Sequence, residues 1–338
     1  MFKHILTWLA GLAMGTGLLV GPAAAADLPG RVPRVGVLIA LHTPESFTGM
    51  DAFADGLRES GYVEGRNIIV DRRAVQGRPR LFQTLADLYR IEAQKLIDAG
   101  AEVIFAPTNA GTYGAFKASE NIPIVFASVM DPDRGPVSIP FTHVPRMVTG
   151  VTVQSEKLNG KRLEILHDAF PNAVRMAVLY DELQRKVCGL ELEDLRKAAD
   201  RLNLQLQEYP VDSVEELERA FAKMSRARID AIVVPFSLTL GATARRVAEL
   251  SAQYRIPVLH EMPDFAEVGG LLSFGPRLDE AYRRAGNYVA RILKGAKPAD
   301  LPLEYPSRFE LVVSLKTARA MKIILPEAVL ARADRIIE

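Results

Sequence analysis

The sequence predicts an α/β protein made of two Rossmann-like, doubly wound parallel-sheet lobes. After Pro33, short runs rich in β-branched residues alternate with longer amphipathic stretches. The alternation stops at a proline-rich segment, residues 131–147, and then resumes for a similar length. A chain of 338 residues is long enough for two domains with separate cores.

The first series contains four predicted strands, each a short run dominated by apolar residues. Gly61 and Gly100 follow the first two helices and act as C-terminal stop signals. Strands joined through helices in this way form a parallel sheet that is covered on both faces. The predicted strands span residues 34–40, 67–71, 103–106 and 122–127, and the helices span 47–60 and 79–99, with one more before the last strand.

The second series repeats the rhythm with five strands. A tail follows that is too small for a third domain, so we expect it to complete both sheets. The chain then crosses between the lobes more than once, which predicts a hinge and an interlobe cleft. The strands are 149–153, 175–180, 205–209, 231–234 and 257–259, with helices 156–170, 187–202, 214–227 and 242–254; the tail adds strands 270–274 and 310–313 and helices 279–293 and 316–321.

The first 26 residues have the layout of a secretory signal peptide. Lys3 provides the positive start, an uncharged apolar run extends from Ile5 to Val20, and small residues lead to Ala26. The apolar run is short for a membrane span, which needs about 20 residues. We therefore predict cleavage after Ala26 and export of residues 27–338; an uncleaved N-terminal anchor is the alternative.

The charge balance gives no indication of nucleic-acid binding. The chain has 42 basic and 41 acidic side chains, and loss of Lys3 would leave 41 of each. A single cysteine, Cys188, excludes an internal disulfide and is interpreted as a packing residue. The histidines are scattered without metal-ligand spacing, and dinucleotide, Walker and nucleophile-elbow motifs are absent. No metal, no cofactor and no enzymatic activity are predicted.

Polar residues follow the predicted strands in both series. Ligands of open parallel sheets bind beyond the carboxyl ends of the strands, so these residues are candidates for a ligand site. The candidates are His42, Thr43, Thr108, Asn109, Thr112, Ser128 and Asp131 from the first series, and Tyr180, Ser237, His260 and Glu261 from the second.

Two of these positions have an equally simple structural explanation. Thr108 or Asn109 is a good N-cap for the helix that follows, and a helix N-terminus also favours an anionic ligand group. The two roles are compatible, because one group can cap the helix while others contact a ligand. Asp131 precedes Pro132, which is a turn signal, but its carboxylate could instead pair with a ligand ammonium.

Several segments together resemble the tryptophan/tyrosine-type family of ABC transporter substrate-binding proteins. They include "GLRESGYVEGRNIIVDRR" (56–73), "NIPIVFASVMDP" (121–132), "GKRLEIL" (160–166), "GGLLSFGP" (269–276) and "FELVVSLKTARAM" (309–321). The resemblance runs from about Arg34 to the end of the chain. It implies the type I periplasmic binding protein fold, with a ligand held between two lobes joined by three crossings. The loops "YDELQRKV" and "VVPFSLTL" depart from the family pattern, so an aromatic amino acid is one candidate ligand among several.

Together with the signal peptide predicted at residues 1–26, the resemblance implies a first lobe (27–145 and 267–302) and a second lobe (146–266 and 303–338). It implies a monomeric periplasmic protein that captures a small polar metabolite, an amino acid or related carboxylate, and delivers it to an ABC permease in the inner membrane. Two alternatives remain: a periplasmic sensor subunit with the same fold, and a periplasmic α/β enzyme.

Overall fold

A computed structural model describes residues 31–40, 49–75, 82–129, 147–153, 158–182, 185–235, 237, 240–241, 243–306 and 308–338, with backbone alone for 40, 82–84 and 185–191. Two sheets organise this part of the chain. In the described residues no helix has the length and apolarity needed to cross a membrane.

The first sheet has five parallel strands in the order β2-β1-β3-β4-β5. Its inner strands are continuous apolar runs, as expected for strands that are buried on both faces. The order reverses between β1 and β3, which is the switch point where ligands bind in such sheets. The strands are β1 (Arg34–Ala40), β2 (Ile69–Val75), β3 (Val103–Phe105), β4 (Ile124–Val129) and β5 (Val148–Thr152).

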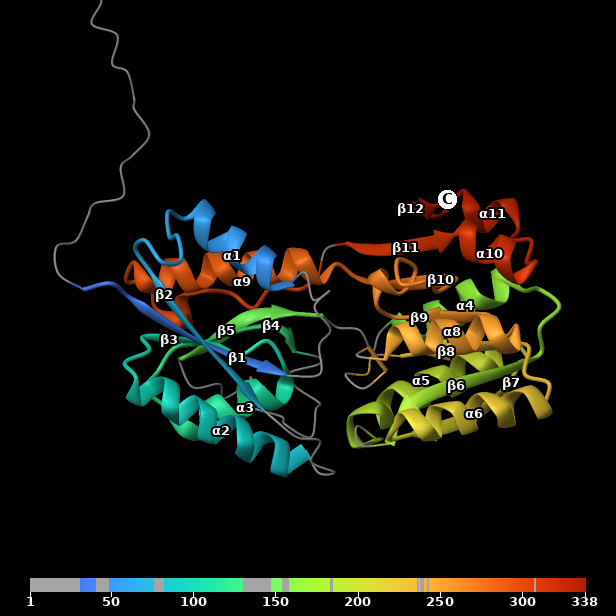
Figure 1. The fold of residues 1–338 in the computed structure, drawn as a ribbon, viewed down its shortest axis with the longest axis horizontal. Helices are drawn as coiled ribbons and strands as arrows, with labels where there is room; N and C mark the ends of the chain where they lie inside the picture. The colour runs from blue at the N-terminus through green and yellow to red at the C-terminus, as the bar shows by residue number, and fades with distance from the viewer. Residues whose placement is uncertain are drawn as a thin grey trace, which may run out of the picture. The chain divides into compact units, whose positions relative to one another are not determined.

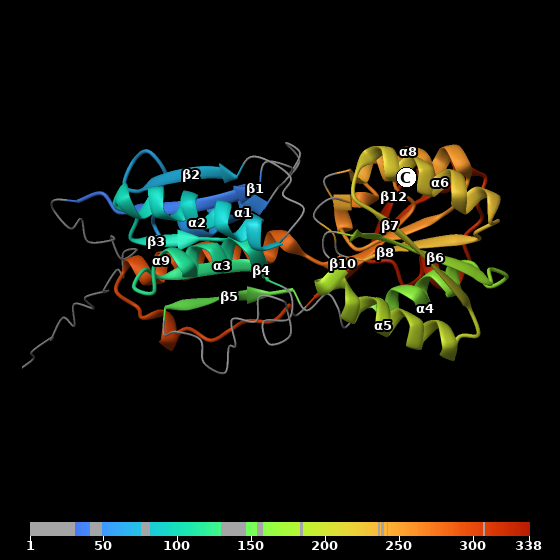
Figure 2. The same ribbon diagram turned by 90° about the horizontal axis from the view of Figure 1, so that it is seen from below.

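Helices cover both faces of the first sheet, as Figures 1 and 2 show. On one face, α2 (Phe82–Asp98) and α3 (Asn109–Ala118) pack on Ile104 and Phe126. On the other face, α1 (Gly49–Glu59) and α9 (Leu278–Leu293) pack on a core that includes Phe105. The Phe105 ring stacks on Phe53 of α1 at 4.2 Å between centroids and meets Tyr282 of α9 edge-on at 5.4 Å. This face of the sheet is therefore fully covered only when α9, which comes late in the sequence, packs against it.

Helices α1 and α9 approach each other unusually closely, because each has a glycine at the contact. A Cβ atom added to Gly56 would lie 2.0 Å from the carbonyl oxygen of Arg283, and one added to Gly286 would lie 2.3 Å from that of Phe53. Arg283 also forms an ion pair with Glu59 across this contact. Helix α9 thus packs directly against α1, although the two are far apart in the sequence.

The second sheet has seven strands in the order β12-β11-β10-β9-β8-β6-β7, and all pairs are parallel except β10 with β11. Again the order reverses, here between β6 and β8. The strands are β6 (Arg175–Asp181), β7 (Gln205–Val211), β8 (Ala231–Val234), β9 (Val258–His260), β10 (Leu272–Pro276), β11 (Phe309–Ser314) and β12 (Arg335–Ile337).

Alternate residues of β6 contact the two helical layers of the second lobe. Val178 belongs to the core beneath α4 (Asn159–Ala169) and α5 (Arg185–Arg201), and Leu179 belongs to the core beneath α6 (Val214–Arg226) and α8 (Ala244–Tyr254). Short helices complete the lobe: η4 (Pro263–Phe265), α10 (Leu315–Met321) and α11 (Glu327–Leu330); in the first lobe η5 (Pro298–Asp300) follows α9.

The strand pairing differs from two of the predicted lobe boundaries. Strand β5 pairs with β4, so the first sheet extends to Thr152 rather than ending at residue 145. Strand β10 pairs with β9 and β11, so it belongs to the second sheet although the first lobe was predicted to include residues 267–302. The chain passes from one sheet to the other after β5, after β10 and before β11. The predicted boundaries followed the proline-rich segments, whereas hydrogen bonding to neighbouring strands determines the sheet to which each strand belongs.

Candidate ligand-binding site

The turn between β3 and α3 lies at the switch point of the first sheet. Thr108 is the N-cap of α3, and its Oγ1 accepts the Gly111 N–H at 3.1 Å. This confirms the predicted cap and assigns it to Thr108. Thr108 and Asn109 are both half-buried.

The other two predicted hydroxyl residues at this sheet edge stabilise the turn through hydrogen bonds to its backbone. Thr112 is buried and donates to the carbonyl oxygens of Ala106 and Thr108, each at 2.9 Å. Ser128, at the neighbouring strand β4, is also buried and donates to the carbonyl oxygen of Pro107. Thr112 and Ser128 therefore fix the backbone on which Thr108 sits, and a direct ligand contact by either remains a prediction.

Two buried tyrosines support the same turn. The phenol of Tyr89 on α2 hydrogen-bonds the Thr108 side chain, and burial raises its pKa to about 12. The phenol of Tyr282 on α9 hydrogen-bonds the Ser128 side chain, and burial raises its pKa as well. Both phenols stay neutral at physiological pH. The sequence interpretation did not identify these two residues, because each lies within a helix far from residues 107–112.

The second lobe has its own polar edge. Ser237 follows β8, and its Oγ accepts the Leu240 N–H at 3.0 Å. Tyr180 and Asp181 end the neighbouring strand β6, and both are buried. Asp181 was not among the predicted ligand residues, although its position after the apolar run of β6 was a usable signal.

His260 and Glu261 lie at the end of β9 and are buried more deeply than the sequence suggested. The His260 Nδ1 accepts the Met262 N–H at 3.0 Å, and its ring stacks on Phe265 with 4.9 Å between centroids. Burial, assisted by the charge of Arg162, lowers the pKa of His260 to about 3, while the Leu240 backbone acts in the opposite direction. The Glu261 carboxylate lies 3.5 Å from the Arg162 guanidinium. Their role as ligand contacts stays a prediction.

Three predicted candidates, His42, Thr43 and Asp131, lie outside the described residues. The described residues include no cluster of three or more His, Cys, Asp or Glu side chains that could hold a metal ion.

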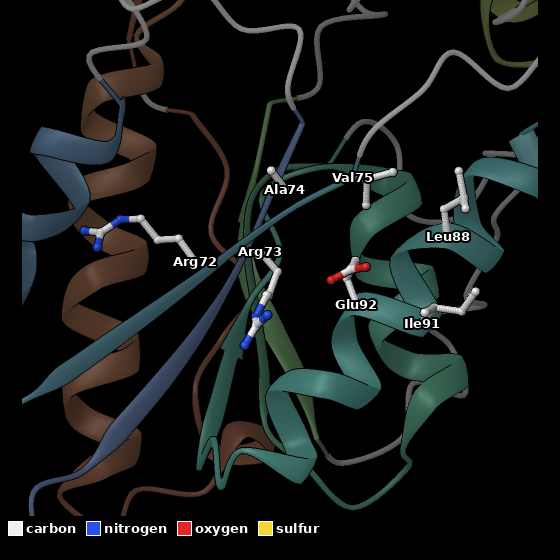
Figure 3. A pocket seen from close by; sticks show the side chains of 7 residues that line it. All are labelled: Arg72, Arg73, Ala74, Val75, Leu88, Ile91 and Glu92. Carbon is white, nitrogen blue, oxygen red and sulfur yellow. The ribbon is translucent and has the colours of Figure 1, made fainter.

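A separate pocket of about 470 Å³ lies at the edge of the first sheet and is lined by none of the predicted ligand residues. Figure 3 shows its lining from β2 and α2, with Arg72 pointing away from Arg73 and Glu92. The charged groups are paired with neighbours: Arg72 with Glu64, Arg73 with Asp71, and Glu92 with Lys95. Its charged side chains thus already form ion pairs with neighbours, and none of the strand-end candidates lines it.

The family model of ABC transporter substrate-binding proteins matches residues 34–337 of the chain. The chain belongs to this family. Its members bind small-molecule substrates, work with ABC transporters and act outside the cytoplasm. This substrate-binding protein is 21% identical to the tyrosine-binding protein of Clostridioides difficile strain R20291 over 291 residues, which is 85% of this chain and 80% of the relative.

Solved structures confirm the predicted class of two parallel-sheet α/β lobes. A conserved domain protein from Vibrio cholerae superposes with a TM-score of 0.77 at 24% identity, covering 90% of this substrate-binding protein and all of the relative. A Streptococcus pneumonia ABC domain in complex with L-Trp superposes with a TM-score of 0.75 at 22% identity, covering 91% of this protein and all of that chain. The match supports the type I periplasmic binding protein fold inferred from the sequence.

Proposed function

We propose that this substrate-binding protein captures an amino acid or a related small carboxylate between its two lobes, without chemical conversion, and delivers it to an ABC permease. The family membership supports solute capture. The tyrosine-binding relative and the L-Trp complex support an amino acid as the ligand. The candidate contacts are Thr108 and Asn109 in the first lobe and Tyr180 and Ser237 in the second.

The observation that carries this proposal is the hydrogen bonding of Thr108. A hydroxyl has two acceptor sites and one hydrogen to donate. The Gly111 N–H occupies one acceptor site, and the Tyr89 phenol forms a hydrogen bond with the same side chain. The half-buried Thr108 hydroxyl thus lies beside the first N–H groups of α3. The N-terminus of α3 carries a partial positive charge. It therefore stabilises an anionic ligand oxygen, such as that of a carboxylate, more than a neutral one.

A ligand series tests the proposal. Thermal unfolding of the purified protein is measured with L-tryptophan, L-tyrosine, tryptamine and indole-3-propionate. A ligand present at ~100 times its Kd should add ~2.7 kcal/mol to the free energy of unfolding. We expect stabilisation by compounds with a carboxylate and none by tryptamine. Stabilisation by tryptamine alone would contradict the carboxylate assignment, and no shift with any amino acid would contradict amino-acid capture.

The substitution Thr108→Val should weaken ligand binding. Valine retains the β-branched shape but loses the hydroxyl, and a hydrogen bond to a charged group contributes about 1.5–3 kcal/mol, so Kd should rise by roughly 10- to 100-fold. Isothermal titration with L-tryptophan measures this change. Ser314→Ala is the matched control, because Ser314 caps α10 after the antiparallel strand β11. The control should lose a similar cap energy, ~1 kcal/mol, and keep its Kd.

The same proposal includes export by the N-terminal segment and function as a monomer. Residues 1–26 have the composition of a signal peptide. Expression of the full chain in a Gram-negative host should give a processed protein, beginning at Asp27, in the periplasmic fraction. Mass spectrometry and light scattering of that fraction check the cleavage and the monomeric state.

A further inference from the structure

Arg162 is the largest of the fully buried side chains in the described structure. It lies on the first turn of α4, within the segment "GKRLEIL" that the proposed function does not use. A buried guanidinium is costly unless its N–H groups find acceptors. The acceptors of its N–H groups therefore indicate what this arginine does in the lobe.

The guanidinium contacts three separate segments of the second lobe. Its Nε donates to the carbonyl oxygen of Phe274 at 2.9 Å, near the end of β10. Its Nη1 donates to Oδ1 of Asn159 at 2.6 Å, three residues earlier at the start of α4. Its Nη2 lies 3.5 Å from Oε2 of Glu261, directly after β9. One planar group thus ties α4, the loop after β9 and the end of β10 together.

The loop after β9 and strand β10 are also packed tightly against each other. A Cβ atom added to Gly275 would lie 2.0 Å from the carbonyl oxygen of Glu261. The Ser273 hydroxyl donates to the carbonyl oxygen of Pro263 at 3.0 Å. Any movement of the loop would therefore be passed to β10, and any movement of β10 would be passed to the loop.

Strand β10 leads directly into a crossing between the lobes. It ends at Pro276, and α9, which packs in the first lobe, begins at Leu278. Figure 1 shows the short connection from β10 to α9. The Phe274 carbonyl held by Arg162 is three residues from Arg277, the junction residue. Arg162 thus fixes the point from which this crossing leaves the second lobe.

Stability alone does not explain an ion pair at this position. Replacing a buried ion pair by apolar side chains of similar volume is often neutral or stabilising, whereas a charged network can select a single arrangement. The rigid, planar guanidinium has donors in fixed directions, which a lysine cannot reproduce. The guanidinium of Arg162 is therefore suited to holding the segments that it contacts in a single arrangement.

We infer that Arg162 is a positioning residue for solute capture: it holds the loop after β9 and the root of the β10–α9 crossing in one arrangement. This inference rests on the proposed function, since the arrangement matters for binding when the lobes take up a solute. Arg162 itself touches no solute in this scheme.

Four variants test the inference, with Kd for L-tryptophan and the melting temperature as readouts. Arg162→Lys keeps the positive charge and leaves Glu261 intact, but cannot reach all three acceptors. We expect its Kd to rise at least 10-fold.

Arg162→Met alone should lower the melting temperature, because it leaves Glu261 buried without its counter-charge. Arg162→Met combined with Glu261→Leu should regain the melting temperature while its Kd stays at least 10-fold above that of the wild type. Arg196→Met on α5, which removes an ion pair with Glu208 on β7, is the matched control and should change neither readout.

Two results would overturn the inference. One is a wild-type Kd in Arg162→Lys. The other is a variant with the apolar pair that regains both stability and affinity, since the arginine would then serve folding alone.

A measurement without ligand separates this inference from the proposed function. Amide hydrogen exchange is compared between the wild type and the variant with the apolar pair. We expect at least 10-fold faster exchange at residues 260–262 and 274–278 and unchanged exchange in β6 and β8. If no amino acid binds the wild type but this pattern appears, the proposed ligand is wrong and the positioning role of Arg162 stands. Unchanged exchange at these residues would refute the role, whatever the ligand.

Discussion

Gly56→Ala is expected to lower the free energy of unfolding by about 3 kcal/mol, the upper end of the usual cost of overpacking. The new methyl group would lie 2.0 Å from the Arg283 carbonyl oxygen of α9, and neither helix backbone can move without disturbing the layer beneath it. The reciprocal variant, Gly286→Ala, meets the same contact from the other side and should have a similar effect. Because both variants widen one interface, the double variant should cost less than the sum of the two.

Urea unfolding followed by circular dichroism measures these changes as a shift of the midpoint. Gly160→Ala on α4 is the control, because its Cβ would meet no described atom closer than 3.4 Å, the end of the Arg201 side chain. It should be neutral or stabilise by up to about 1 kcal/mol through helix propensity. A Gly56→Ala variant as stable as the control would show that α1 and α9 do not pack as closely as described.

The folded protein is expected to lose about 2 kcal/mol of stability between pH 7 and pH 5 through His260 alone. Its pKa is about 3 in the folded state and 6.5 when unperturbed. The unfolded chain therefore binds the proton first as pH falls, so the contribution is complete above about pH 6.5 and is lost progressively toward pH 3. The main cause is burial, and the charge of Arg162 adds to it. Protonation of Nδ1 would also break its hydrogen bond from the Met262 N–H.

Urea midpoints at pH 7, 6 and 5 test this expectation in a range where most carboxylates remain ionised. The substitution His260→Gln should flatten the pH dependence, even if it lowers stability at pH 7. His167→Gln, on α4 of the same lobe, serves as the matched control. An equally steep dependence in His260→Gln would refute the assignment of the acid sensitivity to this residue.

The sequence predicted the buried strands well, because parallel strands covered on both faces are short continuous apolar runs. Strands 34–40 and 231–234 match β1 and β8 residue for residue. Strand β2 was displaced: residues 67–71 were predicted and 69–75 are observed. It is an edge strand that contains Asp71, Arg72 and Arg73, so its sequence has no apolar run. The short elements α11 and β12 were not predicted, since a few residues carry too little periodicity.

The candidate site was predicted in part. The cap at Thr108 was foreseen from its residue type and its position after an apolar run. The burial of His260 and Glu261 was not, because it depends on α4 and β10, which are distant in sequence. Arg162 was missed because an arginine on an amphipathic helix is usually solvent-exposed. A weak signal existed, since Arg162 continues the buried stripe formed by Ile165, Leu166 and Ala169 at helical spacing.

The late position of α9 also matters for how the chain acquires its structure. The five strands of the first sheet are synthesised by residue 152, yet α9, which together with α1 covers Phe105 and its neighbours, begins at Leu278. A nascent polypeptide therefore presents an incompletely covered apolar surface while the whole second half is still being translated. This surface is fully covered only after α9 has been synthesised. Under the proposed export, this order of synthesis would delay folding of the first lobe before the chain crosses the membrane.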